Sequence, residues 1–107
     1  MTLRINKSYD EDLKVWNFKL LGEIDIETSQ ELKVALNESL NQVETDVNLD
    51  CTDLNYIDST GLGVIIGVLN RVKKNENEIL IVNAKNNISK LFKITGLDRI
   101  IKVNSAV

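Results

Sequence analysis

The stretch "DVNLDCTDLNYIDSTGLGVIIGVLNRVKKNENEILIVNA", residues 46–84, decides the fold class. Its first six residues alternate apolar and polar side chains, which predicts a strand. After a loop over residues 52–59, an apolar segment from about Thr60 to Lys74 predicts a helix, and "EILIVNA" predicts a buried strand. A strand, a helix and a second strand in this order form a right-handed crossover, so the two strands lie parallel in one sheet.

The segment at the start of the chain predicts a hairpin. Residues 2–8, "TLRINKS", alternate apolar and polar side chains as a short strand does. Residues 9–12, "YDED", predict a turn, and residues 13–22, "LKVWNFKLLG", alternate again. The two strands are expected to pair antiparallel across this turn.

A first helix is predicted between the hairpin and the strand that starts at residue 46. Thr28 and Glu31 have the spacing of a capping box, in which the two side chains bond free amides at a helix start. The helix is therefore expected to begin near Thr28. Apolar or small residues then recur at helical spacing, at Leu32, Ala35, Leu36, Ser39, Leu40 and Val43.

The last part of the chain predicts a third helix over residues 87–96, "NISKLFKITG". Gly96 is placed as a left-handed C-cap residue with Leu97 just beyond it. Residues 99–103, "RIIKV", predict a short strand or helix, and residues 104–107 predict a frayed tail.

These elements predict one small α/β domain over residues 1–107. The sheet is expected to be mixed but mostly parallel, with about four to five strands and α-helices packed against it. The opening hairpin supplies one antiparallel edge. No internal repeat or low-complexity segment interrupts this order.

Composition excludes several functions. The chain has 107 residues, 43% hydrophobic and 27% charged, with a net charge of −3, so it has no basic field for nucleic acid. Histidine is absent, which removes a Ser-His-Asp triad and most zinc sites. These absences argue against nucleic-acid binding and remove several catalytic and zinc sites. Together with the motifs described below, they predict a non-enzyme with no catalytic residue, no metal site, no cofactor and no direct contact with nucleic acid.

Targeting signals are also missing from the sequence. The start "MTLRINKSYDED" lacks the apolar core of a signal peptide, and no apolar run is long enough to span a bilayer. The single cysteine, Cys51, cannot form an internal disulfide and fits a reducing compartment. The expected location is the cytoplasm, without a membrane partner.

The segment "YIDSTGLGVIIG", residues 56–67, carries the candidate site because it displays a hydroxyl at the start of a helix. Helix capping by Asp58, Ser59 or Thr60 is the simplest explanation. A phosphate-binding glycine loop fits poorly, because the third glycine comes one position late and no Walker lysine follows. A nucleophile elbow fits worse, because it needs G-x-S-x-G and an activating histidine.

The remaining interpretation is that Ser59 is itself a substrate. A phosphate there would add about −1.5 to −2 charge at the positive end of the helix dipole, which the fold should tolerate. Its cost would fall on anything docked against the helix. Two glycines in the first helical turn also suggest that a ligand or another chain approaches the backbone there.

The apolar side chains of this helix leave two interpretations open. They cover more than one face, so the helix is either deeply buried between layers or presents an apolar docking patch to a partner. The residues concerned are Leu62, Val64, Ile65, Ile66, Val68, Leu69 and Val72.

Three motifs resemble the anti-sigma factor antagonists of the STAS family. They are "DSTGLGV" at residues 58–64, "GEID" at residues 22–25 and "LFKITGLDRII" at residues 91–101, so the resemblance covers nearly the whole chain. The Ser-Thr pair, with "RVKK" at residues 71–74, looks closest to the antagonist of the general stress (sigma-B) pathway. The sporulation (sigma-F) antagonist is similar as well.

The resemblance implies a partner switch. In this family the unphosphorylated protein binds an anti-sigma factor that is also a serine kinase, which frees the sigma factor for transcription. The kinase phosphorylates the serine after the aspartate, here Ser59, the phosphoprotein dissociates, and a serine phosphatase resets it. Asp25 matches an acidic position near the serine, and Asp58 either orients Ser59 or caps the helix. The expected partner-binding positions are Asp25, Asp58, Thr60, Gly61, Leu62 and Gly63.

Two other functions stay open. A STAS-like structural module of a larger stress-signalling assembly would oligomerise by itself, whereas an antagonist is expected to be a monomer when free. A small nucleotide hydrolase is supported only by the glycines, and a lack of nucleotide turnover would exclude it.

Overall fold

The computed structural model describes residues 2–106 and contains the strands and helices in the predicted order. The elements are β1 (Leu3–Asp10), β2 (Val15–Ile24), α1 (Ser29–Gln42), β3 (Asp46–Ile57), α2 (Ser59–Lys74), β4 (Ile79–Ala84), α3 (Asn86–Ile94), a 3-10 helix η1 (Leu97–Arg99) and β5 (Lys102–Ser105). Within these residues, none of the helices is long and apolar enough to cross a membrane.

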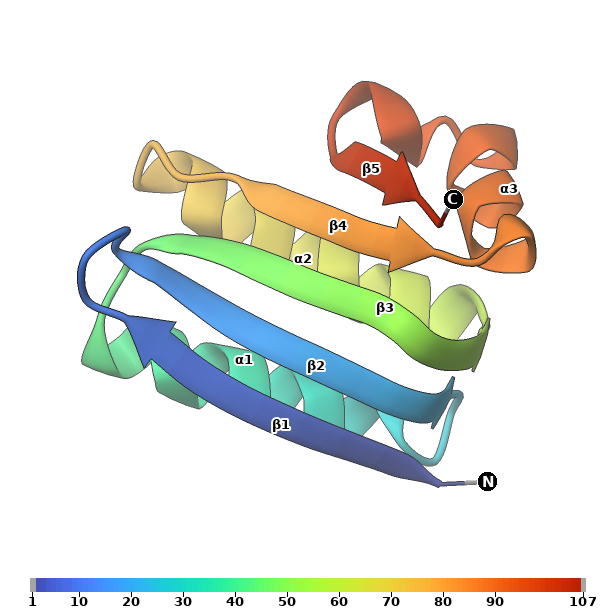
Figure 1. The fold of residues 1–107 in the computed structure, drawn as a ribbon, viewed down its shortest axis with the longest axis horizontal. Coiled ribbons are helices and arrows are strands. Elements are labelled where there is room, and N and C mark those ends of the chain that lie inside the picture. Colours follow the sequence, from blue (N-terminus) through green and yellow to red (C-terminus); the bar gives the residue numbers. More distant parts are fainter. Residues whose placement is uncertain (1, 107) are drawn as a thin grey trace.

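The sheet has five strands in the order β1-β2-β3-β4-β5. β1 pairs antiparallel with β2, and the other neighbours pair parallel. This confirms the predicted mixed, mostly parallel sheet with one antiparallel edge. Because spatial neighbours are also successive in the chain, right-handed crossovers bring the helices to one face. Figure 1 shows α1 behind β1 and β2, and α2 behind β3 and β4, with the other face of the sheet bare.

The core lies between the sheet and the helices. β2 and β3 direct alternate side chains such as Phe18, Leu20 and Leu49 toward the helices, where they are at most 1% exposed. Each such side chain contributes about 1.5–3 kcal/mol on burial. α1 and α2 complete the core with Leu32, Leu36, Leu40, Ile65, Leu69 and Val72.

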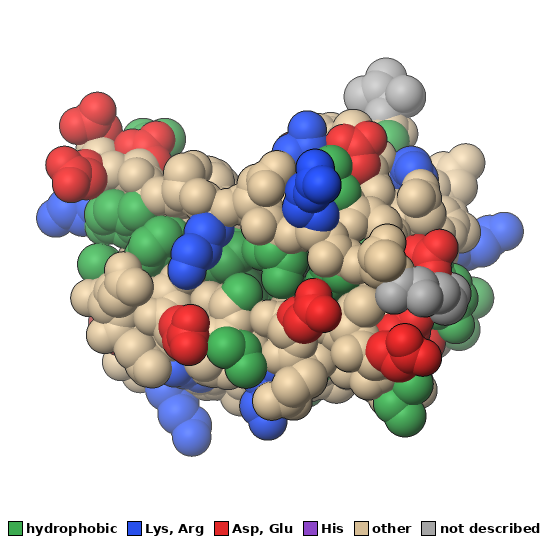
Figure 2. Space-filling model, turned by 90° about the horizontal axis from the view of Figure 1, so that it is seen from below, with side chains coloured by type: hydrophobic (Ala, Val, Ile, Leu, Met, Phe, Trp, Pro, Cys, Tyr) green, Lys and Arg blue, Asp and Glu red, His purple; other side chains and the backbone are tan. Residues whose placement is uncertain are grey.

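An apolar band remains visible beside the edge strand β1. Figure 2 shows this band seen from below Figure 1, as a hollow bordered by charged side chains. The helix-facing side chains of β1, Leu3, Ile5 and Tyr9, are only half-buried because α1 covers them incompletely. The edge of the sheet is therefore less shielded than its centre.

β3 is longer than the sequence predicts. The segment assigned to a loop, residues 52–59, belongs to the strand as far as Ile57, and its Leu54 and Ile57 are buried. Register shifts between β2 and β3, at Lys19/Leu21 and Gly22/Glu23, break the alternation that would have identified it as strand.

The chain ends also differ from expectation. Tyr9 continues β1 in place of the predicted turn, and its ring lies 5.0 Å from that of Trp16. The predicted frayed tail is wrong for residues 104–106, because β5 reaches Ser105 and the Ala106 amide donates to the Ala84 carbonyl at 2.8 Å. Val107 lies outside the described residues. The left-handed Gly96, with φ of 76°, is confirmed.

Candidate functional site

The candidate residues meet at the carboxyl edge of the parallel strands β2 and β3. Ile24 and Ile57 are register partners at the ends of these strands, and the Asp58 amide donates to the Ile24 carbonyl at 3.1 Å. Asp25 and Asp58 are thus the first residues beyond two adjacent strands. In open α/β sheets, the carboxyl ends of the strands are the usual place for binding sites.

Asp58 is the N-cap of α2. Its backbone is extended, and its Oδ1 accepts hydrogen bonds from the amides of Thr60 at 2.9 Å and Gly61 at 3.1 Å. Its Oδ1 also accepts a bond from the Thr60 hydroxyl at 2.5 Å. The Thr60 hydroxyl bond, followed by the amide bonds, lowers the pKa of the Asp58 carboxyl against the opposing effect of burial.

Ser59 is the first residue of α2, and its side chain is exposed. Among the hydrogen bonds of residues 2–106, none involves the Ser59 hydroxyl, whereas the neighbouring Thr60 hydroxyl is held by Asp58. Of the two adjacent hydroxyls, the Ser59 hydroxyl is therefore the one free to meet a second molecule.

Asp25 performs for α1 the capping role that the sequence assigned to Thr28. The Asp25 carboxylate accepts bonds from the amides of Glu27 at 2.9 Å and Thr28 at 3.0 Å. Thr28 has helical backbone angles and makes no capping bond, since its hydroxyl donates to the Glu23 carbonyl at 2.8 Å. The capping-box prediction is wrong, although α1 does begin at Ser29.

The environment of Asp25 is nearly closed. The side chain is 7% exposed, and the Thr28 amide is the main cause that lowers the pKa of its carboxyl, with burial acting in the opposite direction. Gly22, at the start of the "GEID" motif, has φ of 110° and lies against Thr2 so closely that a Cβ would sit 2.4 Å from the Thr2 carbonyl oxygen. Only glycine fits this backbone.

The glycines after Ser59 have different roles. A Cβ at Gly61 would lie 2.6 Å from Ile24 Cγ2 and 2.7 Å from Ile57 Cγ1, so this glycine lets α2 pack on the strand ends. A Cβ at Gly63 would meet no atom within 4 Å. Leu62 is buried at 6% exposure. The sequence argument for a close approach at these glycines thus describes an internal contact at Gly61 and leaves Gly63 open.

Gly63 is part of a groove between α1 and α2. The groove has a volume of about 390 Å³ and is lined by Gln30, Lys33, Asn37, Thr60, Gly63, Val64, Gly67 and Val68. Gly67, one turn after Gly63, also faces open space. Sequence reasoning did not include Gly67 or Lys33 in the site, although the spacing of the two glycines by four residues was available as a signal.

The apolar surface of α2 is largely internal. Leu62, Ile65, Val68, Leu69 and Val72 are buried, and Val64 and Ile66 are half-buried. The interpretation of a helix packed between layers therefore holds for most of these positions. What α2 presents outside is the groove and the exposed Ser59, not a broad apolar patch.

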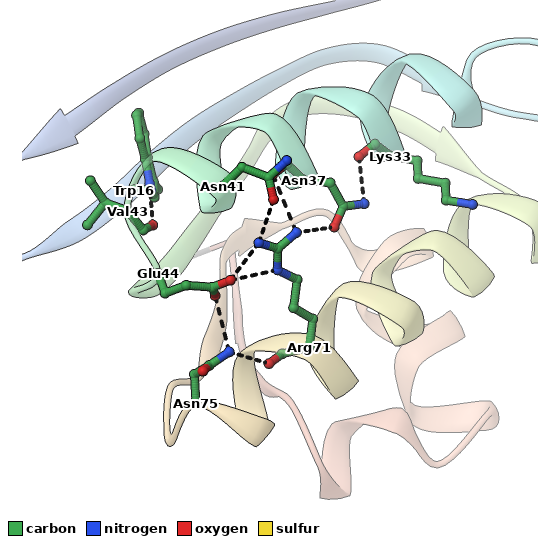
Figure 3. A network of polar contacts seen from close by, with 8 residues as sticks. All are labelled: Trp16, Lys33, Asn37, Asn41, Val43, Glu44, Arg71 and Asn75. Atoms are coloured by element: carbon green, nitrogen blue, oxygen red, sulfur yellow. Dashed lines mark hydrogen bonds and ion pairs between the residues drawn. The ribbon is translucent and has the colours of Figure 1, made fainter.

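A polar network fixes α2 against α1 beyond the groove (Figure 3). The Arg71 guanidinium donates to Asn37 Oδ1 at 3.0 Å, to Asn41 Oδ1 at 2.8 Å and to Glu44 Oε1 at 2.5 Å. Asn75 donates to the other oxygen of Glu44 at 3.3 Å. The network sets the spacing of the two helices that form the groove walls. Sequence reasoning quoted this arginine only as part of "RVKK".

A family model described as "STAS domain" matches residues 7–107. The chain belongs to the STAS domain family. An anti-sigma-B factor antagonist of Staphylococcus aureus is 34% identical over 91 residues, which is 85% of this chain and 84% of the relative. An anti-sigma-B factor antagonist of Staphylococcus epidermidis is 33% identical over 104 residues, which is 97% of this chain and 94% of the relative.

Solved structures of proteins described as anti-sigma factor antagonists share the fold. A Thermotoga maritima protein, described as a candidate anti-sigma factor antagonist, aligns with a TM-score of 0.86 at 24% identity, over 96% of this chain and 87% of the other. The unphosphorylated form of the anti-sigma factor antagonist SpoIIAA aligns with a TM-score of 0.73 at 17% identity, over 99% of this chain and 90% of the other. At these identities the likeness shows the fold alone.

Proposed function

We propose that this STAS protein is an anti-sigma factor antagonist whose binding is switched by phosphorylation of Ser59. The unphosphorylated form binds an anti-sigma factor serine kinase and so releases a sigma factor, and the phosphorylated form dissociates until a serine phosphatase resets it. The curated relatives named anti-sigma-B factor antagonists support this assignment. The whole cycle is proposed to take place in the cytoplasm and to involve the protein as a monomer.

The contrast between the two adjacent hydroxyls carries the proposal. The Ser59 hydroxyl is exposed and has no described intramolecular bond, while the Thr60 hydroxyl donates to the Asp58 carboxylate at 2.5 Å. A kinase must bring its acceptor hydroxyl in line with the phosphate of ATP, and a hydroxyl that is already bonded inside the protein has to be freed first. Ser59 is therefore the favoured acceptor.

The fold can carry the phosphate without rearrangement. A phosphate on Ser59 would sit at the N-terminus of the 16-residue helix α2, where the dipole favours negative charge. The amides of Thr60 and Gly61 are already bonded to Asp58, so they are not available to draw the phosphate onto the helix end. The added charge would stay at the surface and act on a docked partner by repulsion and desolvation.

The surroundings of Ser59 offer contacts for that partner. The groove that starts at Thr60 has a floor without side chains at Gly63 and Gly67, so the backbone or a side chain of the kinase can approach α2 closely. The half-buried Asp58, next to Ser59, adds an ionised carboxylate that favours a basic group on the kinase, whereas the buried Asp25 supports the strand edge from behind. Leu62, being buried, supports this surface from beneath.

The test is intact mass spectrometry after incubation with the cognate anti-sigma factor kinase and ATP. Wild type and Thr60→Ser are expected to gain one phosphoryl group, and Ser59→Ala is expected to gain none while still binding the kinase. In calorimetry, Ser59→Asp should bind the kinase about tenfold or more weakly than wild type. A phosphoryl group on Ser59→Ala, or equal affinities for wild type and Ser59→Asp, would contradict the proposal.

A further inference from the structure

The outer edge of β1 is available for pairing. β1 bonds to β2 along all its 8 residues without a register shift, and within residues 2–106 no strand lies on its other side. An edge strand of this length presents a row of unpaired amides and carbonyls. β1 contains neither proline nor a bulge, two of the features that commonly block such an edge. The backbone is therefore able to accept another strand.

A side-chain surface accompanies this edge. Leu3, Ile5 and Tyr9 of β1 and Ala35 of α1 are half-buried and pack against the edge of the core. Figure 2 shows an apolar hollow on the side of the molecule seen from below. Trp16 of β2 lies beneath Tyr9, with ring centroids 5.0 Å apart. An added strand would place alternate side chains over this hollow and complete a layer that α1 leaves open.

The α1 border of the hollow is acidic. Glu31 and Glu38 are exposed and lie two helical turns apart on α1, on the same flank as Ala35. At one end of β1, residues 10–12 add three further carboxylates. Figure 2 shows acidic side chains along one side of the hollow, and basic side chains on the opposite side and across it. The matching occupant carries positive charge where it faces Glu31 and Glu38.

We propose that the β1 edge and the hollow between β1 and α1, together the β1 surface, bind an extended, positively charged segment of a partner protein as an added strand. Backbone bonds to β1 would supply the affinity, apolar side chains would fill the hollow, and lysine or arginine side chains would pair with Glu31 and Glu38.

A second copy of this chain suits the surface less well. In an antiparallel pair of two β1 strands centred on Lys7, the two Lys7 side chains would lie directly opposite each other as like charges. Lys7 reaches over the hollow, and its Nζ donates to Ser39 Oγ at 3.4 Å. The acidic flanks of the two α1 helices would face each other too. Both effects disfavour self-pairing.

The β1 surface is independent of the Ser59 switch. It uses β1, β2 and one flank of α1, whereas α2 packs on the other flank of α1 through Asn37 and Asn41. Ser59→Asp is therefore expected to leave binding at the β1 surface unchanged. A negative result at the β1 surface would therefore leave the Ser59 proposal untouched, and a negative result at Ser59 would leave the β1 proposal untouched.

The probe is a short synthetic peptide with the repeat valine-threonine-lysine-threonine, which places valine and lysine on the same face of a strand. It is titrated into isotope-labelled protein and followed by amide NMR. Control peptides have the same sequence with alternate backbone amides methylated, or glutamate in place of lysine. The protein variants are Glu31→Gln with Glu38→Gln, and a control with the same charge change elsewhere, Glu76→Gln with Asp98→Asn.

We expect shifts centred on residues 3–10 and slower amide exchange at the β1 edge with the lysine peptide. Loss of both α1 carboxylates should weaken binding roughly threefold or more at low salt, and the control variant much less. No binding, equal binding of the methylated or glutamate peptide, or equal effects of the two variants would overturn the proposal. Formation of a β1-paired dimer by the free protein would overturn it too.

Discussion

Asp25 and Asp58 stand in equivalent places, one residue beyond the register partners Ile24 and Ile57. The Asp58 carboxylate accepts hydrogen bonds from amides of the first turn of α2, and the Asp25 carboxylate accepts them from amides of the turn that leads into α1. The two strand ends are linked by the bond from the Asp58 amide to the Ile24 carbonyl at 3.1 Å. One capping device, used twice, therefore builds the edge that displays Ser59. Each aspartate holds a helix start in place, in addition to any contact that it makes with a partner.

The two capping aspartates predict a stability that depends on pH in the acid range. The pKa of both carboxyls is lowered in the folded protein relative to the ordinary value of 3.8. A lowered pKa contributes stability that is present above the unfolded value and is lost as pH falls through the folded value. The thermal midpoint of wild type should therefore fall more steeply below pH 3.8 than that of the double variant Asp25→Asn, Asp58→Asn.

Asparagine retains the acceptor oxygen of a cap, so the double variant should still fold near neutral pH. Melting curves followed by circular dichroism over the acid range provide the comparison. Parallel loss of stability in the two proteins would show that the caps do not depend on the charged form.

The two glycines of "STGLG" predict opposite effects on stability. Gly61→Ala places a methyl group 2.6 Å from Ile24 Cγ2, and such overpacking typically costs about 1–3 kcal/mol. Gly63→Ala meets open space in a helix, where alanine is favoured by about 1 kcal/mol. Urea unfolding of both variants measures the difference.

The Gly63 variant also separates folding from binding. If Gly63 is retained for a close approach of the kinase, Gly63→Ala should be at least as stable as wild type and should bind the kinase more weakly. Undiminished kinase binding by the stable variant would remove Gly63 from the partner surface.

The sequence predicted most of the fold because most of its strands and helices have a recognisable local residue pattern. Apolar alternation identified the hairpin and the parallel strands, helical spacing identified α1 and α2, and Gly96 marked the end of α3. The end of β3 was missed because its buried Leu54 and Ile57 lie three residues apart, outside the two-residue period of a regular strand. The register of β3 against β2 shifts in this part of the sheet.

The sequence identified the residues of the site but not the role of each one. Sequence placed Ser59 and Thr60 together at the helix start, but the bond from the Thr60 hydroxyl to Asp58 separates them only in three dimensions. Likewise, the constraint on Gly61 comes from Ile24, a residue of another strand. Thr28 has the capping-box sequence, yet Asp25 makes the cap because the helical turn already begins after it.

The Arg71 network predicts a specific loss when the guanidinium is removed. Arg71→Met retains the hydrophobic stem but breaks the bonds to Asn37, Asn41 and Glu44, so the free energy of unfolding should fall by about 1 kcal/mol for these partly exposed groups. Arg71→Lys should recover little of it, because an ammonium cannot bond several acceptors in the guanidinium plane. Chemical denaturation measures the free energy of unfolding of each variant. Full recovery of stability by Arg71→Lys would mean that only the positive charge matters.

We predict that the Cys51 thiol does not react until the protein unfolds. The side chain lies in β3 at 2% exposure, and its Sγ is 3.7 Å from the Leu49 carbonyl. Burial, with a smaller contribution from the Asp50 charge, raises the pKa of the thiol to about 12. Because the thiolate is the reactive form, an aromatic disulfide reagent should label native protein at neutral pH only as fast as the chain opens. One thiol per chain should react at once in denaturant, since Cys51 is the only cysteine.

Labelling of native protein at the rate of the denatured chain would show that β3 is not closed in solution. Slow labelling that tracks stability across the Gly61→Ala and Arg71→Met variants would instead make Cys51 a direct reporter of opening of the core.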